Sequence, residues 1–159
     1  MKSTALPLVI VFALISAPLS VAQENAAKGP DVFQNVQMLI PHGNKVDQIA
    51  VRIQFNEGSL TIESRKGDSV LKDFKYSEIK SAEYSYSKHP RWKTGLAAAA
   101  VLNIFALPIF FMKGKKHWLT VKTDKDYAVL RLDKNNYKVI LPIFETRSGV
   151  KVETLGEDK

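Results

Sequence analysis

The stretch from Gly95 to Met112 constrains this chain most, because it runs for eighteen residues without a charged side chain. Two basic clusters that each contain a Trp flank it, over 88–93 and 113–118. An apolar run, Trp at the interface and Lys or Arg near the head groups are typical of a segment that contacts a bilayer. The rest of the chain predicts a small β-rich domain, so the fold has to accommodate this segment as an interruption.

The N-terminus has the features of a secretory signal peptide. Lys2 provides a positive start, the stretch from Ala5 to Ala17 is mostly apolar, and Ser20 to Ala22 offers small residues for a signal peptidase. We therefore expect a signal peptide over 1–22, cleavage before Gln23 and a periplasmic or other extracytoplasmic location. An uncleaved anchor helix is the alternative, although the apolar run is short for a span. The chain has no Cys, which excludes disulfides, thiolate metal sites and lipid attachment at a lipobox.

The net positive charge of the chain belongs to the flanks of the apolar segment. Without Lys2 the net charge falls from +7 to +6. Six basic residues and no acidic residue lie between positions 88 and 118, so the remainder is neutral. A nucleic-acid-binding protein would instead carry its basic residues across a folded face, so we expect no nucleic-acid partner.

Alternating apolar residues predict an antiparallel meander around the apolar segment. Ile49, Val51, Ile53 and Phe55 alternate with more polar neighbours, which is typical of a half-buried strand. Further strands are expected over 60–63, 70–76, 82–87, 118–123 and 127–132, separated by short turns at 56–58, 65–68, 76–79 and 124–126. The stretch 32–40 fits a weak strand or a short helix, and the sequence does not decide between them.

One amphipathic helix is expected to close the domain. Tyr137, Ile140, Leu141 and Phe144 have helical spacing, after an N-cap signal over 133–136 and before a candidate C-cap at Gly149. Pro142 should kink this helix or break it into two turns. A last short strand is expected over 150–152. The predicted organisation is a leader and N-terminal segment over 23–48, one domain over 49–152, an apolar insertion over 94–112 within it and a polar tail over 153–159.

A strand meander closed by a C-terminal helix resembles the pleckstrin-homology (PH) superfold, most closely its GRAM and bacterial PH-like branches. The resemblance is carried by Val70–Ile79 and by Ala128–Phe144. It implies a mainly β fold with a C-terminal α-helix, and a binding or scaffold module rather than an enzyme. Lipid-binding PH domains carry Lys and Arg around their first hairpin, where this chain has Asn56-Glu57-Gly58, and a Trp in the final helix that is absent here. Inositol-phosphate recognition is therefore not implied.

Three interpretations of the apolar segment compete. As a single helix it would reach about 27 Å, just short of a hydrocarbon core of about 30 Å, and would separate strands of one sheet. As a hairpin that dips into lipid, it would bend at Asn103 and Pro108 and return to the same side, although its backbone would need hydrogen-bond partners. It could also be a helix or strand pair buried against the domain or a second copy, since Ala97 to Ala100 are small. The hairpin is favoured.

No motif for catalysis, a metal or a cofactor is found in the sequence. His42, His89 and His117 lack partners at metal-ligand spacing, and no phosphate loop or nucleophile motif occurs. We expect a non-enzymatic, exported, membrane-associated PH-like module that binds lipid, in particular anionic lipid. The alternative is a soluble secreted or periplasmic interaction protein whose apolar segment is buried in a protein partner or homo-oligomer. The expected membrane contacts are Lys88, Arg91, Trp92, Lys93, Leu96, Val101, Leu102, Ile104, Phe105, Leu107, Ile109, Phe110, Phe111, Lys113, Lys115, Lys116 and Trp118.

Overall fold

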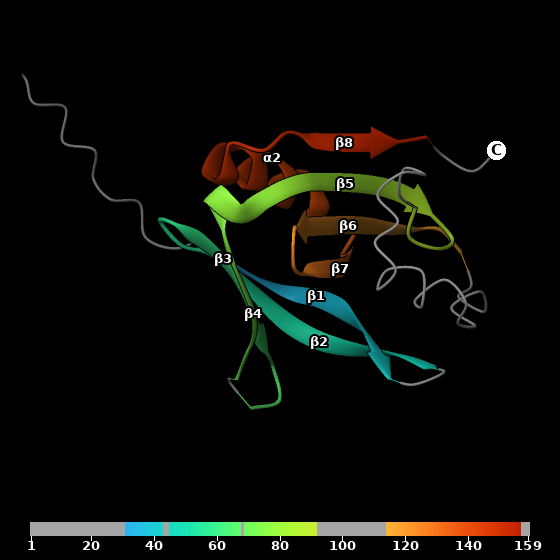
Figure 1. Cartoon of the computed structure of the whole chain (residues 1–159). Helices are drawn as coiled ribbons and strands as arrows, with labels where there is room; N and C mark the ends of the chain where they lie inside the picture. Colours follow the sequence, from blue (N-terminus) through green and yellow to red (C-terminus); the bar gives the residue numbers. More distant parts are fainter. Residues whose placement is uncertain (1–30, 43–44, 68, 92–113, 157–159) are drawn as a thin grey trace, which may run out of the picture.

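The computed structural model describes residues 31–42, 45–67, 69–91 and 114–156, which form eight strands, one α-helix and one 3₁₀ helix (Figure 1). All eight strands belong to one sheet, in the order β4-β3-β2-β1-β7-β6-β5-β8. The elements are β1 (Asp31–His42), β2 (Lys45–Phe55), β3 (Ser59–Ser64), β4 (Val70–Lys75), η1 (Tyr76–Glu78), β5 (Ile79–Ser87), β6 (Lys116–Thr123), β7 (Tyr127–Leu132), α2 (Tyr137–Ser148) and β8 (Val152–Leu155). The prediction of a mainly β fold with a C-terminal helix is confirmed.

Strand β1 joins the two halves of the sheet. It pairs antiparallel with β2 from Asp31↔Phe55 to His42↔Lys45, and with β7 through Gln37↔Arg131 and Met38↔Leu130. Figure 1 shows β1 to β4 in the lower part of the view and β5 to β8 in the upper part. The stretch that fitted either a strand or a helix is thus a central strand. The predicted domain start at Ile49 is wrong, because the sheet begins at Asp31.

The first hairpin of the sheet therefore connects β1 to β2, and the turn at Asn56–Gly58 belongs to the second. Asn56-Glu57-Gly58 therefore does not form the first hairpin, as the resemblance to lipid-binding PH domains implied, and that expectation is wrong. The error has a plain cause, since the polar residues within β1 weaken its alternation and hide it as a strand. Residues 43–44, between β1 and β2, lie outside the described part of the chain.

The main core lies on one face of the strands, as their alternation predicts. Val51, Ile53 and Phe55 of β2 are fully buried, while Arg52 and Gln54 between them are partly exposed. Helix α2 adds Phe144, whose ring lies edge-on to Phe55 with centroids 6.4 Å apart. A second, smaller cluster contains Leu39, Trp118 and Val129. Because neighbouring residues of a strand point to opposite faces, this cluster lies on the face away from the main core.

Helix α2 runs from Tyr137 to Ser148 without interruption at Pro142, so of the two expected outcomes, a kink or a break into two turns, the break does not occur. Pro142 is exposed, and water can therefore satisfy the carbonyl that its missing N–H leaves without a donor. The helix ends at Gly149 as predicted. The φ angle of Gly149 is 69°, and its N–H donates to the carbonyl of Glu145 at 2.9 Å.

The last strand, β8, pairs parallel to β5 from Ala82↔Val152 to Ser85↔Leu155. It lies slightly later in the chain than the strand expected over 150–152, so part of the predicted polar tail belongs to the sheet. The tail residues 157–159 lie outside the described residues. With β8 at its edge, β5 is paired on both sides.

Candidate functional site at the base of the insertion

The pairing of β5 with β6 fixes where the apolar insertion leaves and rejoins the fold. Ser87 at the end of β5 lies opposite Lys116 at the start of β6, and Tyr86 lies opposite His117. The chain between these strands, residues 88–115, therefore begins and ends at the same end of the β5–β6 pair. We call residues 88–91 and 114–118 the base of the insertion.

Hydrogen bonds hold this base against the sheet and the chain end. The indole Nε1–H of Trp118 donates to the carbonyl of Ser87 at 3.1 Å, and Ser87 Oγ donates to the carbonyl of His89 at 2.5 Å. The backbone N–H of Arg91 donates to Ser85 Oγ at 3.3 Å, and its Nη1 donates to the carbonyl of Gly156 at 3.1 Å. The two ends of the insertion are thus fixed relative to each other.

Only some of the predicted membrane contacts belong to the described residues. Lys88 is exposed at the base, and Arg91, Lys115 and Lys116 are partly exposed there. Trp118 is 1% exposed, within the cluster that also contains Leu39 and Val129. The predicted interfacial position is therefore wrong for Trp118, because its side chain is needed for packing. The other predicted contacts lie outside the described residues: Trp92, Lys93, Leu96, Val101, Leu102, Ile104, Phe105, Leu107, Ile109, Phe110, Phe111 and Lys113.

Next to the base, four aromatic rings stack on one another. The His117 ring lies between Tyr137, with centroids 3.8 Å apart, and Tyr86, with centroids 4.6 Å apart. Tyr84 lies parallel to Tyr137 at 5.9 Å, and its hydroxyl forms a 2.6 Å hydrogen bond with His117 Nδ1. The alternation along β5 shows that Tyr84 and Tyr86 share a face, but nothing local indicates that Tyr137 joins them.

Burial lowers the pKa of His117 below its ordinary value, and the carboxylate of Asp133 opposes this only in part. The neutral imidazole is therefore the favoured form within the stack. The faces of the His117 ring are occupied by Tyr86 and Tyr137, so the stack is not an open aromatic cage for a cationic ligand.

Tyr86 and His117 also line a cavity of about 470 Å³, which we call the basic groove. Its other lining residues come from β1, β2, the β3–β4 turn, the start of β6 and the residue before it, the end of β7 and the turn after β7. Five cationic side chains and one carboxylate give it a net charge of +4. These charged residues are Arg65, Lys115, Lys116, Arg131, Lys134 and Asp133.

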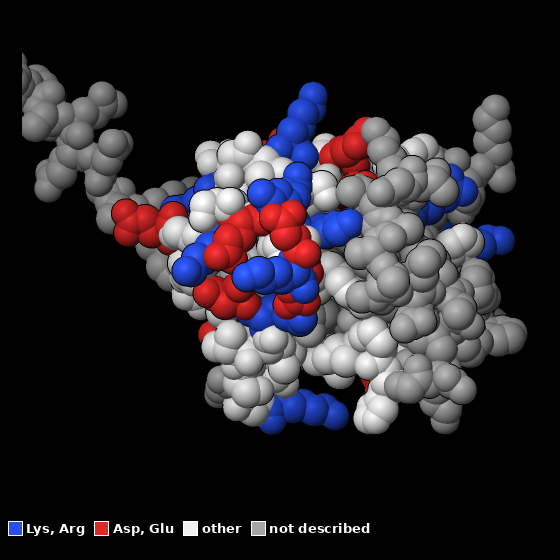
Figure 2. Space-filling model, in the orientation of Figure 1, with Lys and Arg blue, Asp and Glu red and all other residues white. Residues whose placement is uncertain are grey.

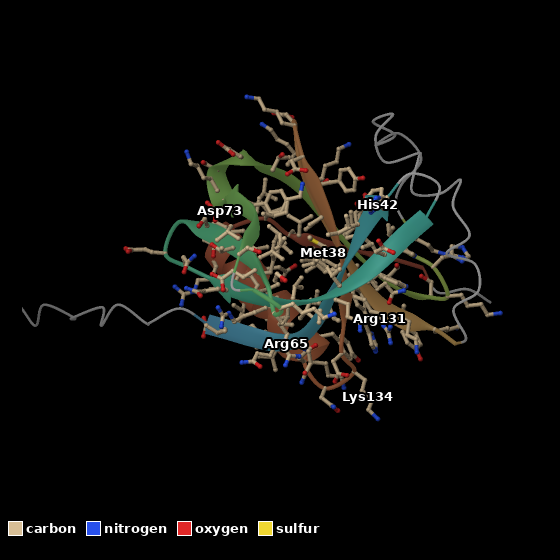
Figure 3. All side chains as sticks on the ribbon, turned by 90° about the horizontal axis from the view of Figure 1, so that it is seen from below. Met38, His42, Arg65, Asp73, Arg131 and Lys134 are labelled. Carbon is tan, nitrogen blue, oxygen red and sulfur yellow. The ribbon has the colours of Figure 1, made fainter. Side chains whose placement is uncertain are left out.

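Figure 3 shows Arg65, Arg131 and Lys134 together on one side of the molecule, although they come from the β3–β4 turn, from β7 and from the turn between β7 and α2. Sequence reasoning missed these three residues as a group. Arg65 is far in sequence from Arg131 and Lys134, and only the sheet order brings the three together. Lys115 and Lys116 belong both to the groove and to the base of the insertion.

Neither a metal site nor a membrane-spanning helix is found in the described part of the chain. No group of three His, Asp or Glu residues there has the geometry to hold a metal ion. Within the same residues, no helix has the length and apolar character needed to cross a membrane.

No family model and no curated protein matches the sequence. One matching solved structure is that of the Spt16D Pob3N heterodimer, at 10% identity and a TM-score of 0.49, with 84% of this chain and 57% of that chain covered. This chain thus spans little more than half the length of the chain it matches. Another is the hSac2 domain from human phosphoinositide phosphatase Sac2, at 10% identity and a TM-score of 0.44, with 81% of this chain and 79% of that chain covered. The structure itself shows a mainly β fold with one eight-stranded sheet and the C-terminal helix α2.

Proposed function

We propose that this protein is a non-enzymatic, exported module of the bacterial PH-like type, attached to a membrane through the apolar insertion. The observation that carries the proposal is the register of β5 and β6, which places Ser87 opposite Lys116. A segment that leaves β5 and enters β6 at the same end of this strand pair can enter a bilayer from one side while the sheet stays intact. The apolar sequence from Gly95 to Met112 supplies the surface for the hydrocarbon.

The charges at the base support a preference for anionic lipid. Lys88, Arg91, Lys115 and Lys116 lie there in the described structure, and Lys93 and Lys113 follow in the sequence. Each basic residue near an anionic surface contributes about 1 kcal/mol before screening by salt. The apolar insertion contributes independently of lipid charge, at about 25 cal/mol per Å² of buried apolar surface.

Deletion of residues 92–113 tests the attachment. Residues 88–91 and 114–115 would then connect two strand ends that already lie opposite each other, so we expect the sheet to form and its signal to remain in the far-UV circular dichroism spectrum. The protein that lacks residues 92–113 should no longer co-sediment with phosphatidylcholine or phosphatidylglycerol vesicles. Sedimentation equal to that of the intact chain would refute membrane attachment through the insertion.

The matched charge variant changes Lys113, Lys115 and Lys116 together to Gln. It should bind phosphatidylglycerol vesicles more weakly than the intact chain does and bind neutral vesicles as before, because the apolar contact remains. An equal loss on both vesicle types would contradict the electrostatic part of the proposal.

One observation favours the alternative function, an interaction protein whose apolar segment is buried by a partner or a second copy. The apolar segment contains the small residues Ala97 to Ala100, which suit close packing against protein. Under this alternative an alkaline wash would release the protein from membranes. Leu102→Asp would then disrupt a detergent-free monomer–dimer equilibrium, which analytical ultracentrifugation measures.

A further inference from the structure

The basic groove opens where two paired strands separate. Strands β1 and β7 pair through Gln37↔Arg131 and Met38↔Leu130. Towards its N-terminal end, β1 is irregular between Phe33 and Val36, and Asn35 adopts a φ of 60°. Asn35 and Gln37 both line the groove, so the irregularity in β1 helps to shape it.

Four of the five cations of the groove have no acidic partner in the described part of the chain. Among the described residues, Arg65, Lys116, Arg131 and Lys134 take part in none of the ion pairs that the structure contains. The one carboxylate of the groove belongs to Asp133, whose Oδ1 accepts a 2.9 Å hydrogen bond from the backbone N–H of Asn135.

Charges are balanced over another part of the molecule. Basic and acidic side chains are interleaved on the face over β3 and β4 that Figure 2 shows. Arg52 Nε donates to Glu63 at 2.8 Å, and Lys72 Nζ lies 2.5 Å from Asp126. The excess of cations in the groove is therefore a local property and does not describe the surface as a whole.

Arg131 is held in place by neutral groups. Its Nη1 donates to Gln37 Oε1 at 2.9 Å and to Gln48 Oε1 at 3.1 Å. Two amide oxygens orient the guanidinium group without cancelling its charge. Both contacts use Nη1, so within the described structure the Nε–H and Nη2–H groups have no acceptor. This edge of the guanidinium presents two parallel donors, the arrangement that pairs with two oxygens of a phosphate.

We propose that the basic groove binds the phosphate group of an anionic ligand, with Arg131 as the bidentate donor and Lys116, Lys134 and Arg65 as surrounding charges. A volume of about 470 Å³ admits more than inorganic phosphate, so the ligand is a phosphate ester. The phosphate comes either from a lipid head group, which the adjacent base of the insertion would bring near, or from a soluble ester. This inference does not depend on membrane attachment, because the groove is built from the folded sheet alone.

Nuclear magnetic resonance of the full-length, ¹⁵N-labelled chain tests the proposal without a membrane. Inorganic phosphate is titrated against chloride at constant ionic strength, and the side-chain Nε–H signal of Arg131 is followed. We expect phosphate to shift this signal saturably and chloride to leave it in place. Arg131→Gln should weaken phosphate binding by about tenfold or more, read from the backbone amide of Asn35, because a charge-assisted hydrogen-bond pair is lost.

Lys134→Gln provides a second variant with little risk to folding, since Lys134 is exposed, and it should weaken binding by roughly twofold to fivefold. The control is a double Gln variant at Lys75 and Lys151, two exposed lysines that do not line the groove. It should bind phosphate as the parent chain does. Equal shifts with phosphate and chloride, or equal weakening in the control and in Arg131→Gln, would overturn the proposal.

Vesicles distinguish the two sources of phosphate. Arg131 and Lys134 lie outside the flanks of the insertion, so their variants change the groove and leave the flanking lysines in place. If both variants also weaken binding to phosphatidylglycerol vesicles, the groove takes a lipid phosphate. If they weaken phosphate binding and leave vesicle binding unchanged, the groove takes a soluble ester. Failure of the deletion test alone would refute membrane attachment and leave the groove in place.

Discussion

Replacing Trp118 with Phe should destabilise the fold, because the structure buries this side chain. The indole Nε1–H donates to the carbonyl of Ser87 at 3.1 Å, and the ring is 1% exposed. Phe cannot donate, and leaving the buried carbonyl without this donor costs about 1–3 kcal/mol. The smaller ring also leaves a cavity, which adds about 1 kcal/mol at about 24 cal/mol per Å³. We therefore expect the free energy of unfolding to fall by about 2–4 kcal/mol.

Urea unfolding followed by far-UV circular dichroism measures this loss as a lower midpoint with an unchanged slope. Val70→Ala is the control, because Val70 is 58% exposed at the start of β4 and its truncation should change stability by less than about 0.5 kcal/mol. A loss of less than about 1 kcal/mol for Trp118→Phe would refute the burial and the hydrogen bond together.

Fluorescence gives an independent check of the same position. The chain has two Trp residues, so Trp92→Phe leaves Trp118 as the only one. Its emission should be blue-shifted in buffer, and lipids that carry a bromine or nitroxide quencher should not reduce it. Strong quenching by such vesicles would place Trp118 at the membrane, in contradiction to its packing against Leu39 and Val129.

Two further predictions concern the stack and the core. Burial lowers the pKa of His117, so as the pH falls below about 6.5 the unfolded chain binds the proton before the folded chain does, and stability decreases. His117→Gln should remove this part of the decrease in the urea midpoint between about pH 7.5 and about pH 5; an identical decrease in both proteins would contradict it. Phe144→Ala should cost about 3–5 kcal/mol, because Phe144 is fully buried against Phe55. Val139→Ala in the same helix, 49% exposed, serves as its control in thermal unfolding and should cost less than about 0.5 kcal/mol.

Local patterns predicted much of the fold because the residues of each element carry their own signal. The alternation from Ile49 to Phe55 predicted most of β2, and the spacing from Tyr137 to Phe144 predicted α2. Gly149 was predicted correctly as the C-cap, since a left-handed residue there favours glycine. Such signals depend only on neighbours in the sequence, so they can be recognised without knowledge of the tertiary structure.

The missed features depend on contacts between distant segments. Strand β1 has polar residues and an irregularity at Asn35, so its alternation is weak, and only its position between β2 and β7 makes it central. Trp118 lies next to a basic cluster, which resembles an interfacial anchor in sequence, yet the pairing of β6 turns it onto a covered face. The basic groove could not be predicted, because Arg65 and Arg131 meet only through the sheet order.

The register of β5 with β6 also has a consequence for how the chain folds. Pairing Ser87 with Lys116 requires closing a loop of residues 88–115. Compared with a connection of six residues, a loop of this length adds about 1 kcal/mol of closure entropy. The insertion thus makes the β5–β6 contact non-local and slows the step that forms it. A chain without the insertion should fold faster and gain stability, so retention of the segment has to be explained by what it does after folding.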